Sequence, residues 1–327
     1  MRFTEIESKT LKDELPNTEM WTYPYYAYKQ AILQHEYQPT KKYVKITNSF
    51  RLLINEPHFC LERQYMYLIS VSSSAANTER RTAIRNTWGN QTLLNQTKGG
   101  IIFLLGKVND DRRLQMQIYE ESMRHRDIIQ GNFADAYRNL TLKSVMALKW
   151  FSSYCPRVRF LMKTDDDIYV NANKLSHFLY KNQNKKRWIV GCVKTHARLP
   201  FQMKKNVRIS SFNLPAAHPT FVAGAGYIIS SDIVEELHEA SEKLTVLPVE
   251  DVFITGHCSK TIGVKPEHDF RFSCGEAVQD YCHLFSNKFT GHRVSAQQQV
   301  EIWKYANNPR MCKKKLYNKT GSFKENF

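Results

Sequence analysis

The chain has 327 residues, of which 42% are hydrophobic, 12% aromatic and 24% charged, and this composition excludes a disordered, collagen-like or low-complexity protein. Its longest apolar stretches, at residues 101–105 and 221–229, are far shorter than the roughly 20 residues of a membrane helix. Lys and Arg number 47 against 31 for Asp and Glu, a formal net charge of +16. Such an excess favours anionic partners, although a solvated basic surface explains it equally well. The basic runs are short and lack the spacing of a nucleic-acid reader, so no nucleic-acid partner is expected.

The periodic part of the sequence begins near residue 50. Residues 1–50 contain many Tyr, Lys and Gln without a sustained period, and we interpret them as a stem or lead-in segment. One globular domain is expected over residues 51–310, followed by a basic tail over residues 311–327. The polar start of the chain lacks the apolar core of a signal peptide or signal anchor. Either the protein is cytosolic, or its membrane-proximal start is missing from this sequence.

The pattern of apolar residues predicts alternating strands and helices. Strands are predicted at residues 64–71, 100–105, 127–129, 159–163, 188–193 and 221–230. Helices are predicted after Asn77, over residues 110–124, from Asn139, and over residues 232–244 with Asp232 as the cap. This alternation indicates an α/β fold with a mostly parallel sheet covered by helices on both faces.

The cysteines and sequons favour an oxidising compartment. Seven cysteines lie far apart, at positions 60, 155, 192, 258, 274, 282 and 312. They form no CxxC pair, which argues against a zinc ribbon or finger. Sequons for N-glycosylation occur at Asn90, Asn95, Asn139 and Asn318, and together with spread cysteines they are typical of a glycosylating lumen. The odd count leaves at least one thiol free or paired between chains.

The strongest candidate for chemistry is a run of three carboxylates, Asp165, Asp166 and Asp167, directly after a predicted buried strand. Ligands bind at the carboxyl ends of strands in open α/β sheets, and adjacent carboxylates repel one another unless a cation or hydrogen-bond donors compensate. Hard divalent cations accept such oxygen ligands and bridge them to phosphates. A solvated turn with one capping aspartate is the alternative. The apolar residues on both sides favour the functional interpretation, because a cluster flanked by buried residues is hard to leave uncompensated.

Two further segments combine polar or small residues with apolar neighbours. Glu250 and Asp251 precede an apolar stretch; they suit a helix N-terminus, and a carboxylate there could also act as a general base. Gly224 and Gly226 lie within a predicted strand, where glycine permits a close approach of the backbone to a ligand or forms a bulge.

Three basic or titratable side chains are also candidates. Arg81 and Arg85 are four residues apart in a predicted helix, so they share one face and suit diphosphate contacts, although surface arginines are common. His292 is either a metal ligand or a histidine satisfied within the fold.

Taken in order, six segments of this chain resemble the β1,3-glycosyltransferase family, typified by the β1,3-galactosyltransferases and β1,3-N-acetylglucosaminyltransferases. They are RRTAIRNTWG, FLLG, DIIQGNFADAYRNLTLK, RFLMKTDDDIYV, GAGYIIS and EDVFITG. The resemblance extends from about residue 50 to about residue 303, roughly four-fifths of the chain. Six motifs in register are far more specific than any one of them.

The resemblance implies a GT-A fold, a single α/β domain that binds a nucleotide sugar. It also implies a type II Golgi membrane enzyme with a lumenal catalytic domain, which uses manganese and inverts the anomeric configuration. The expected reaction moves a hexose from a UDP-sugar, with UDP-galactose the first expectation, to a hydroxyl of a glycoprotein or glycolipid glycan. The product is a β1,3 linkage. Membrane anchoring is expected only through an N-terminal segment that this chain does not show.

By position, the resemblance implies a role for each acid of the two motifs. Asp167 matches the main metal ligand, and His292 matches the late histidine that completes the metal site. Asp165 and Asp166 are directed towards the ribose and the donor sugar. Asp251 matches the catalytic base.

The remaining matched residues are expected to bind the nucleotide sugar. Arg81 and Arg85 match the arginines near the nucleotide, and Lys163 matches the residue that enters the metal motif. The other members of this set are Gly224, Gly226 and Glu250.

Two departures from the family pattern affect local structure. The common Tyr-Cys-Ser before the glycines is Phe221, Val222 and Ala223 here, so the disulfide of that cysteine cannot be assumed. The Glu-Asp-Val motif is followed by a segment one residue longer than the commonest spacing, which affects the helix that follows.

Two other classes of protein compete with the enzyme. One is a catalytically silent relative that acts as a binding protein or chaperone, and the intact acids argue against it. The other is a basic protein that binds nucleic acid or transfers phosphoryl groups with a metal, and nothing in the order of the motifs supports it.

Overall fold

The computed structural model describes residues 50–61, 63–109, 111–195, 218–308 and 310–312, all within the unit Val44–Phe327. The lead-in expected over residues 1–50 lies outside the described residues except for Phe50, and the basic tail over 311–327 does so except for Met311 and Cys312. None of the described helices is long and apolar enough to cross a membrane.

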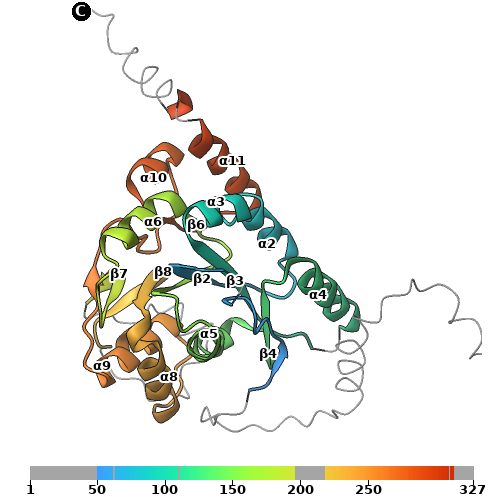
Figure 1. The fold of residues 1–327 in the computed structure, drawn as a ribbon, viewed down its shortest axis with the longest axis vertical. Helices are drawn as coiled ribbons and strands as arrows, with labels where there is room; N and C mark the ends of the chain where they lie inside the picture. The colour runs from blue at the N-terminus through green and yellow to red at the C-terminus, as the bar shows by residue number, and fades with distance from the viewer. Residues whose placement is uncertain (1–49, 62, 110, 196–217, 309, 313–327) are drawn as a thin grey trace, which may run out of the picture. The chain divides into compact units, whose positions relative to one another are not determined.

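An eight-stranded sheet forms the centre of the fold, with the strand order β1-β4-β3-β2-β5-β8-β7-β9 (Figure 1). Its strands are β1 (Leu52–Ile54), β2 (Tyr67–Ser72), β3 (Gly99–Lys107), β4 (Ile128–Ala134), β5 (Phe160–Asp165), β7 (Ile189–Lys194), β8 (Phe221–Ser230) and β9 (Glu267–His268). Strands β2 to β5 pair in parallel, as do β7 and β9. The mostly parallel sheet expected from the sequence is therefore confirmed. Strand β8 runs antiparallel to both of its neighbours, and β1 runs antiparallel to β4.

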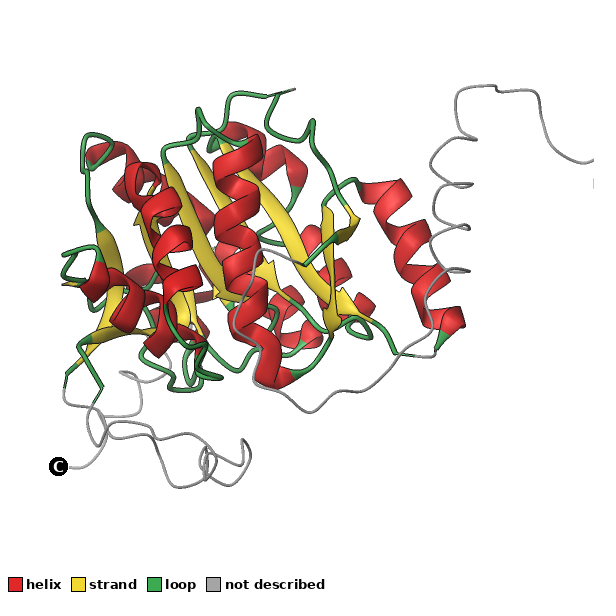
Figure 2. Cartoon of the chain, turned by 90° about the horizontal axis from the view of Figure 1, so that it is seen from below, coloured by secondary structure: helices red, strands yellow, loops and turns green. Residues whose placement is uncertain are grey.

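Helices cover both faces of this sheet (Figure 2). They are α2 (Thr78–Arg85), α3 (Gln91–Gln96), α4 (Arg112–His125), α5 (Leu140–Tyr154), α6 (Ala172–Lys181), α8 (Val234–Lys243), α9 (Ser259–Thr261), α10 (Tyr281–Asn287) and α11 (Ala296–Asn307). Short helical turns of other kinds are η1 (Tyr137–Asn139), η3 (Ser231–Ile233) and η4 (Val252–Cys258). A two-stranded sheet pairs β6 (Tyr169–Val170) with β10 (Thr290–Gly291).

Two hydrophobic clusters fill the space between the sheet and its helices. In β2, Tyr67 and Ile69 face one cluster while Leu68 faces the other, because successive side chains of a strand point to opposite faces. The first cluster packs against α2, α3, α4, α6 and α11, and the second packs against α5, α8 and η4. Figure 1 shows α5 and α8 on one side of the sheet and α2, α3, α6 and α11 on the other. Burial on both faces explains why the strands read as continuous apolar runs.

Two residues that the sequence suggests as helix caps have other partners. Asn77 lies at the N-cap of α2, but its side chain makes no cap bond and instead donates to Asp166 Oδ2 at 2.9 Å. Asp232 lies in the short turn η3, and it accepts a hydrogen bond from the backbone N–H of Arg187 at 2.9 Å. Helix α8 therefore begins at Val234 rather than at residue 232. Both side chains are used for contacts between elements.

The segment after Glu250 and Asp251 is a π-helical turn, η4. Such turns close hydrogen bonds over five residues instead of four and accommodate one extra residue, which agrees with the longer spacing noted in the sequence. Gly256 in this turn allows a close approach to the first residue of β8, since an added Cβ would lie 3.2 Å from Phe221 Cβ. The turn is therefore packed directly against the start of β8.

Three disulfides and one thiol account for the seven cysteines. The pairs are Cys60–Cys155, Cys192–Cys274 and Cys282–Cys312. Cys258 in η4 is the free cysteine and is buried. The odd thiol expected from the count is thus internal.

Candidate active site

The candidate residues gather at one edge of the sheet, where the parallel strands β2 and β5 both end. Ser72, the last residue of β2, pairs in register with Asp165, the last residue of β5. Because β8 is antiparallel to β5, with Tyr227 opposite Lys163, the first half of β8 lies beside the end of β5. This reversal brings Gly224 to the same edge as the aspartates.

The three consecutive aspartates have three different environments. Asp166 is buried, and its Oδ2 accepts hydrogen bonds from Ser73 Oγ at 2.7 Å and Asn77 Nδ2 at 2.9 Å. Arg80 Nη1 lies 3.4 Å from the other oxygen of Asp166. The resemblance directed this residue towards the donor, but in the structure its carboxylate faces inward and fastens the loop after β2 to the end of β5.

Asp165 forms an ion pair with the buried Lys163, whose Nζ lies 3.0 Å from Asp165 Oδ1 without the geometry of a hydrogen bond. Burial raises the pKa of Asp165, while Lys163 opposes that rise. Its side chain remains 28% exposed. Of the two residues expected to face the donor, Asp165 is the one that keeps an open side.

Asp167 faces His292 across the short sheet of β6 and β10. Gly291 pairs with Tyr169, and the backbone N–H of Val294 donates to the carbonyl of Asp167 at 2.8 Å. These contacts hold Asp167 Oδ2 3.7 Å from His292 Nε2, and both side chains are partly exposed. The pairing of β6 with β10 thus brings together Asp167 and His292, which lie far apart in the sequence.

The Asp167–His292 pair fits a divalent cation. A separation of 3.7 Å is too long for a hydrogen bond, whereas two ligands each about 2.1 Å from one ion can lie up to about 4.2 Å apart. His292 Nδ1 contacts the carbonyl of Gly275 at 2.9 Å. In the neutral imidazole this places the proton on Nδ1 and the lone pair on Nε2, the nitrogen that faces Asp167. Among the described residues, no group of three or more His, Cys, Asp and Glu could hold a metal alone. A cation here would need oxygen atoms from a substrate and water, as is usual for ions bound with phosphates.

Lys163 joins the end of β5 to Glu250 and β8. Its Nζ lies 3.0 Å from Glu250 Oε2 and donates to the carbonyl of Gly224 at 3.2 Å. Glu250 also accepts a hydrogen bond from the Tyr227 hydroxyl. Burial alone would lower the pKa of Lys163, but the two carboxylates outweigh it and raise the pKa. Lys163 and Glu250 therefore form a buried ion pair next to the edge of the sheet where the aspartates lie.

Asp251 is held by two backbone N–H groups. Oδ2 accepts from Gly224 at 2.9 Å and Oδ1 accepts from Val252 at 2.9 Å. Burial, and then the charge of Glu250, raise the pKa of Asp251 to about 6. The carboxylate is thus fixed in position and more basic than an ordinary aspartate, two properties of a general base.

The two glycines of β8 have different functions in the fold. An added Cβ at Gly224 would lie 3.4 Å from Asp251 Oδ2, an ordinary contact distance, so Asp251 packs directly on this part of the strand. Gly226 has a φ of +128°, a conformation that disfavours other residues. A Cβ there would lie 2.9 Å from Thr290 Cγ2, so Gly226 permits the contact between β8 and β10.

Arg81 and Arg85 form an internal ion-pair network. Arg81 is fully buried; it donates to both oxygens of Glu121 and to the carbonyls of Ser74 and Ala75 in the loop after β2. Arg85 pairs with Glu121 and Asp127 and lies over the ring of Phe103. Their expected contact with the nucleotide stays a prediction. In the structure, Arg81 supports the loop that holds Asp166, and Arg85 joins Glu121 to Asp127.

Several supporting residues were not singled out from the sequence. Ser73 and Asn77 both donate hydrogen bonds to Asp166, but nothing in the sequence around them indicated such a partner. Tyr227 follows the two glycines and binds Glu250, and its place in an apolar strand gave no sign of this. Gly275 had no sequence signal at all, because its carbonyl acts through the backbone.

The comparisons with known proteins agree on one family. The family model described as galactosyltransferase matches residues 79–269. β-1,3-Galactosyltransferase 1 of Mus musculus is 32% identical over 258 residues, which cover 78% of this chain and 78% of that protein. The chain belongs to the galactosyltransferase family. Lactosylceramide 1,3-N-acetyl-β-D-glucosaminyltransferase A of Xenopus laevis is also 32% identical, over 80% of this chain and 71% of that protein.

A member of the galactosyltransferase family is a glycosyltransferase, and the resemblance inferred from the six motifs is confirmed. The GT-A type α/β fold, with its mostly parallel sheet between two layers of helices, is confirmed as well. Among solved structures, a galactosyltransferase crystallised with donor and acceptor sugar analogues aligns with 73% of this chain and 95% of its own, at a TM-score of 0.36 and 9% identity.

Proposed function

We propose that this glycosyltransferase moves galactose from UDP-galactose to a hydroxyl of a glycoprotein or glycolipid glycan, with inversion, and forms a β1,3 linkage. The observation that carries the proposal is the arrangement at the sheet edge. Asp251 is fixed by two backbone N–H groups and has a pKa of about 6, and the Asp167–His292 pair lies on the same side of the fold. A base and an anion-neutralising site are the two parts that such a transfer needs.

Asp251 is the proposed base. Its carboxylate accepts the proton of the acceptor hydroxyl as that oxygen attacks the anomeric carbon, and the bond from this carbon to the UDP oxygen breaks. Attack opposite an α-linked leaving group gives a β-linked product in one step. A pKa of about 6 keeps the carboxylate ionised at neutral pH while making it a better proton acceptor than a free aspartate.

Asp167 and His292 are the proposed ligands of manganese. The bound cation would neutralise the charge that develops on the diphosphate of the leaving UDP. Asp167 supplies a carboxylate oxygen and His292 the Nε2 lone pair that the Gly275 contact leaves free. The other residues of the proposed donor site act at the same edge. Asp165 offers its open side, while Asp166, Lys163, Glu250, Arg81 and Arg85 support it from within the fold through the contacts described above.

We propose that the domain works in the Golgi lumen, anchored by a segment that precedes it. The three disulfides support an oxidising compartment.

The decisive experiment is a donor screen with the purified chain and Mn²⁺, in which UDP release is measured with and without simple galactosides. We expect release from UDP-galactose that increases with acceptor, and that disappears on removal of divalent cations. Asp251→Asn should lower kcat at least about 100-fold, since it removes the base. Asp232→Asn is the matched control, because Asp232 contacts Arg187 away from the site.

Activity that survives complete removal of divalent cations would contradict the metal role. Wild-type activity in Asp251→Asn would contradict the assignment of the base. A blank result with every UDP-sugar would favour the catalytically silent relative instead.

A further inference from the structure

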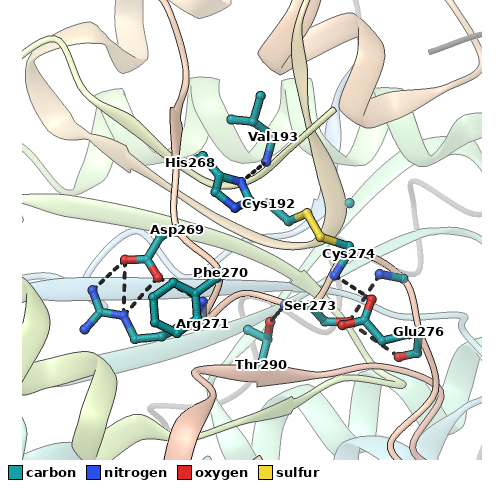
Figure 3. The surroundings of a disulfide bond; sticks show 12 residues. Cys192, Val193, His268, Asp269, Phe270, Arg271, Ser273, Cys274, Glu276 and Thr290 are labelled. Carbon is teal, nitrogen blue, oxygen red and sulfur yellow. Dashed lines mark hydrogen bonds and ion pairs between the residues drawn. A yellow bond between two sulfur atoms is a disulfide. The ribbon is translucent and has the colours of Figure 1, made fainter. Parts of the chain in front are cut away.

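Residues 269–278, which we call the tethered loop, contact both β7 and His292, the candidate metal ligand. The backbone N–H of Asp269 donates to the carbonyl of Gly191 in β7 at 2.9 Å. Five residues later, Cys274 forms a disulfide with Cys192 of the same strand. Figure 3 shows the disulfide between Cys192 and Cys274, with His268 and Val193 on one side and Ser273, Glu276 and Thr290 on the other.

The tethered loop also contacts β10 and the residue that follows it. The backbone N–H of Ser273 donates to Thr290 Oγ1 at 2.8 Å, and that of Val278 donates to the carbonyl of His292 at 3.2 Å. Between these two contacts, the carbonyl of Gly275 lies 2.9 Å from His292 Nδ1. The loop therefore holds both the backbone and the imidazole of His292.

The Gly275 contact determines which nitrogen of His292 is free. A carbonyl can only accept a hydrogen bond, so Nδ1 must carry a proton. In the neutral imidazole, the form that binds a metal, the lone pair then lies on Nε2. Nε2 is the atom that lies 3.7 Å from Asp167 Oδ2. A histidine that binds a metal commonly donates its other N–H to a carbonyl or carboxylate, and loss of that partner weakens metal binding about 10- to 100-fold.

The orientation of the Gly275 carbonyl depends on an unusual backbone conformation. Gly275 has a φ of +108°, which other residues rarely adopt. The local hydrogen bonds that accompany it stay inside the loop, from Gly275 N–H to Ser273 Oγ and from Cys274 N–H to Glu276 Oε2. The Cys192–Cys274 disulfide is the covalent link from this part of the loop to the central sheet, beside the Asp269–Gly191 hydrogen bond and the buried ring of Phe272.

We propose that the Cys192–Cys274 disulfide and the Gly275 carbonyl are positioning groups for His292, so that divalent-cation affinity depends on this one disulfide. The proposal rests on the metal role assigned to Asp167 and His292. It assigns no chemistry to the disulfide itself, which acts by holding the carbonyl against Nδ1.

The test is a titration of Mn²⁺ into the full chain in the presence of UDP. Free Mn²⁺ is followed by its electron paramagnetic resonance signal and corrected with a protein-free titration for the Mn²⁺ that UDP binds. The double variant C192A/C274A should bind Mn²⁺ about 10- to 100-fold more weakly than the wild type. C60A/C155A is the matched control: it also removes one disulfide, but its cysteines lie at the other side of β2 and β5 from the loop, so Mn²⁺ affinity should be unchanged.

Gly275→Ala keeps the disulfide and disfavours the φ of +108°, so it should weaken Mn²⁺ binding even if C192A/C274A fails to fold. The inference is overturned if wild type binds Mn²⁺ and both folded variants bind it equally well. If the wild type itself binds no Mn²⁺, the proposed metal role fails first and the inference falls with it.

Discussion

Asp165, Asp166 and Asp167 illustrate how three adjacent carboxylates are tolerated. Adjacent carboxylates repel one another unless their charges are compensated. Asp165 is paired with Lys163, and Asp166 accepts from Ser73 and Asn77. Asp167 is the one that faces a histidine at 3.7 Å with no bond between them. Asp167 is therefore the carboxylate that is left for the proposed cation. Asp166 holds the loop after β2, and Asp165 keeps an exposed side towards the proposed donor site.

Glu250 offers a test of how the basicity of Asp251 is set. Burial and the negative charge of Glu250 raise the pKa of Asp251 to about 6. In Glu250→Gln that charge is absent, so the pKa of Asp251 should fall towards its ordinary value of 3.8. The base must be ionised to act, so activity is lost as the pH falls through its pKa. The acidic limb of the pH profile of kcat/KM should therefore shift to lower pH.

Tyr227→Phe is the control for this prediction, because it removes the hydrogen bond to Glu250 but keeps the charge. Its acidic limb should not move to lower pH. An unmoved limb in Glu250→Gln would show that Glu250 does not set the basicity of Asp251.

At the scale of elements, the contact between β8 and η4 positions Asp251, the proposed base. Thr255 in the π-helical turn accepts a hydrogen bond from the backbone N–H of Val222 at 2.8 Å and donates to the carbonyl of Asp251 at 2.6 Å. The buried hydroxyl of Thr255 thus links β8, which carries Gly224, to Asp251, whose carboxylate accepts a hydrogen bond from Gly224 N–H. The π-helical turn, with its extra residue, brings this hydroxyl into place.

Thr255→Val should therefore harm both stability and catalysis. The substitution keeps the shape of the side chain but leaves the N–H of Val222 without its partner in the buried β8–η4 contact. Leaving a buried donor unsatisfied costs about 1–3 kcal/mol, which urea denaturation would measure as a lower free energy of unfolding. We expect kcat to fall as well, because Asp251 loses a contact.

Thr255→Ser keeps the hydroxyl and should lie close to the wild type in both measurements. If Thr255→Val and Thr255→Ser proved equally stable and equally active, the hydroxyl would not be what joins the two elements.

At the scale of the whole molecule, two disulfides join segments that are far apart in the sequence, one disulfide on each face of the sheet. Cys60–Cys155 closes a span of 95 residues and joins the segment after β1 to the end of α5. Cys192–Cys274 closes 82 residues between β7 and the tethered loop. Cys60 and Cys155 belong to the hydrophobic cluster that packs against α5, α8 and η4. The Cys192–Cys274 disulfide lies near His292, a candidate metal ligand. Their expected functions differ accordingly.

Removal of Cys60–Cys155 should lower stability without altering cation binding. A cross-link over a long span restricts the unfolded chain and typically contributes about 2–4 kcal/mol. C60A/C155A should therefore unfold at a lower urea concentration than the wild type. A variant as stable as the wild type would indicate that the packing around Cys60 and Cys155 already fixes these segments.

The sequence by itself determined the main strands, the helices α2, α4, α5 and α8, and the family, and it predicted which residues make up the candidate site. Apolar runs located β3, β5 and β8, and the acidic triplet fell at the end of β5 as expected. This succeeded because strand and helix patterns depend on near neighbours in the chain. The six motifs in order gave the family, which the comparisons confirm.

Only the tertiary structure decided which partners these residues have. It reversed β8, paired the cysteines, turned Asp166 inward and set His292 opposite Asp167. It also enclosed Arg81 among Glu121 and loop carbonyls, where the sequence suggested a diphosphate contact or a surface residue. These outcomes depend on contacts between segments distant in the chain, and no local pattern of residues encodes which distant groups will meet.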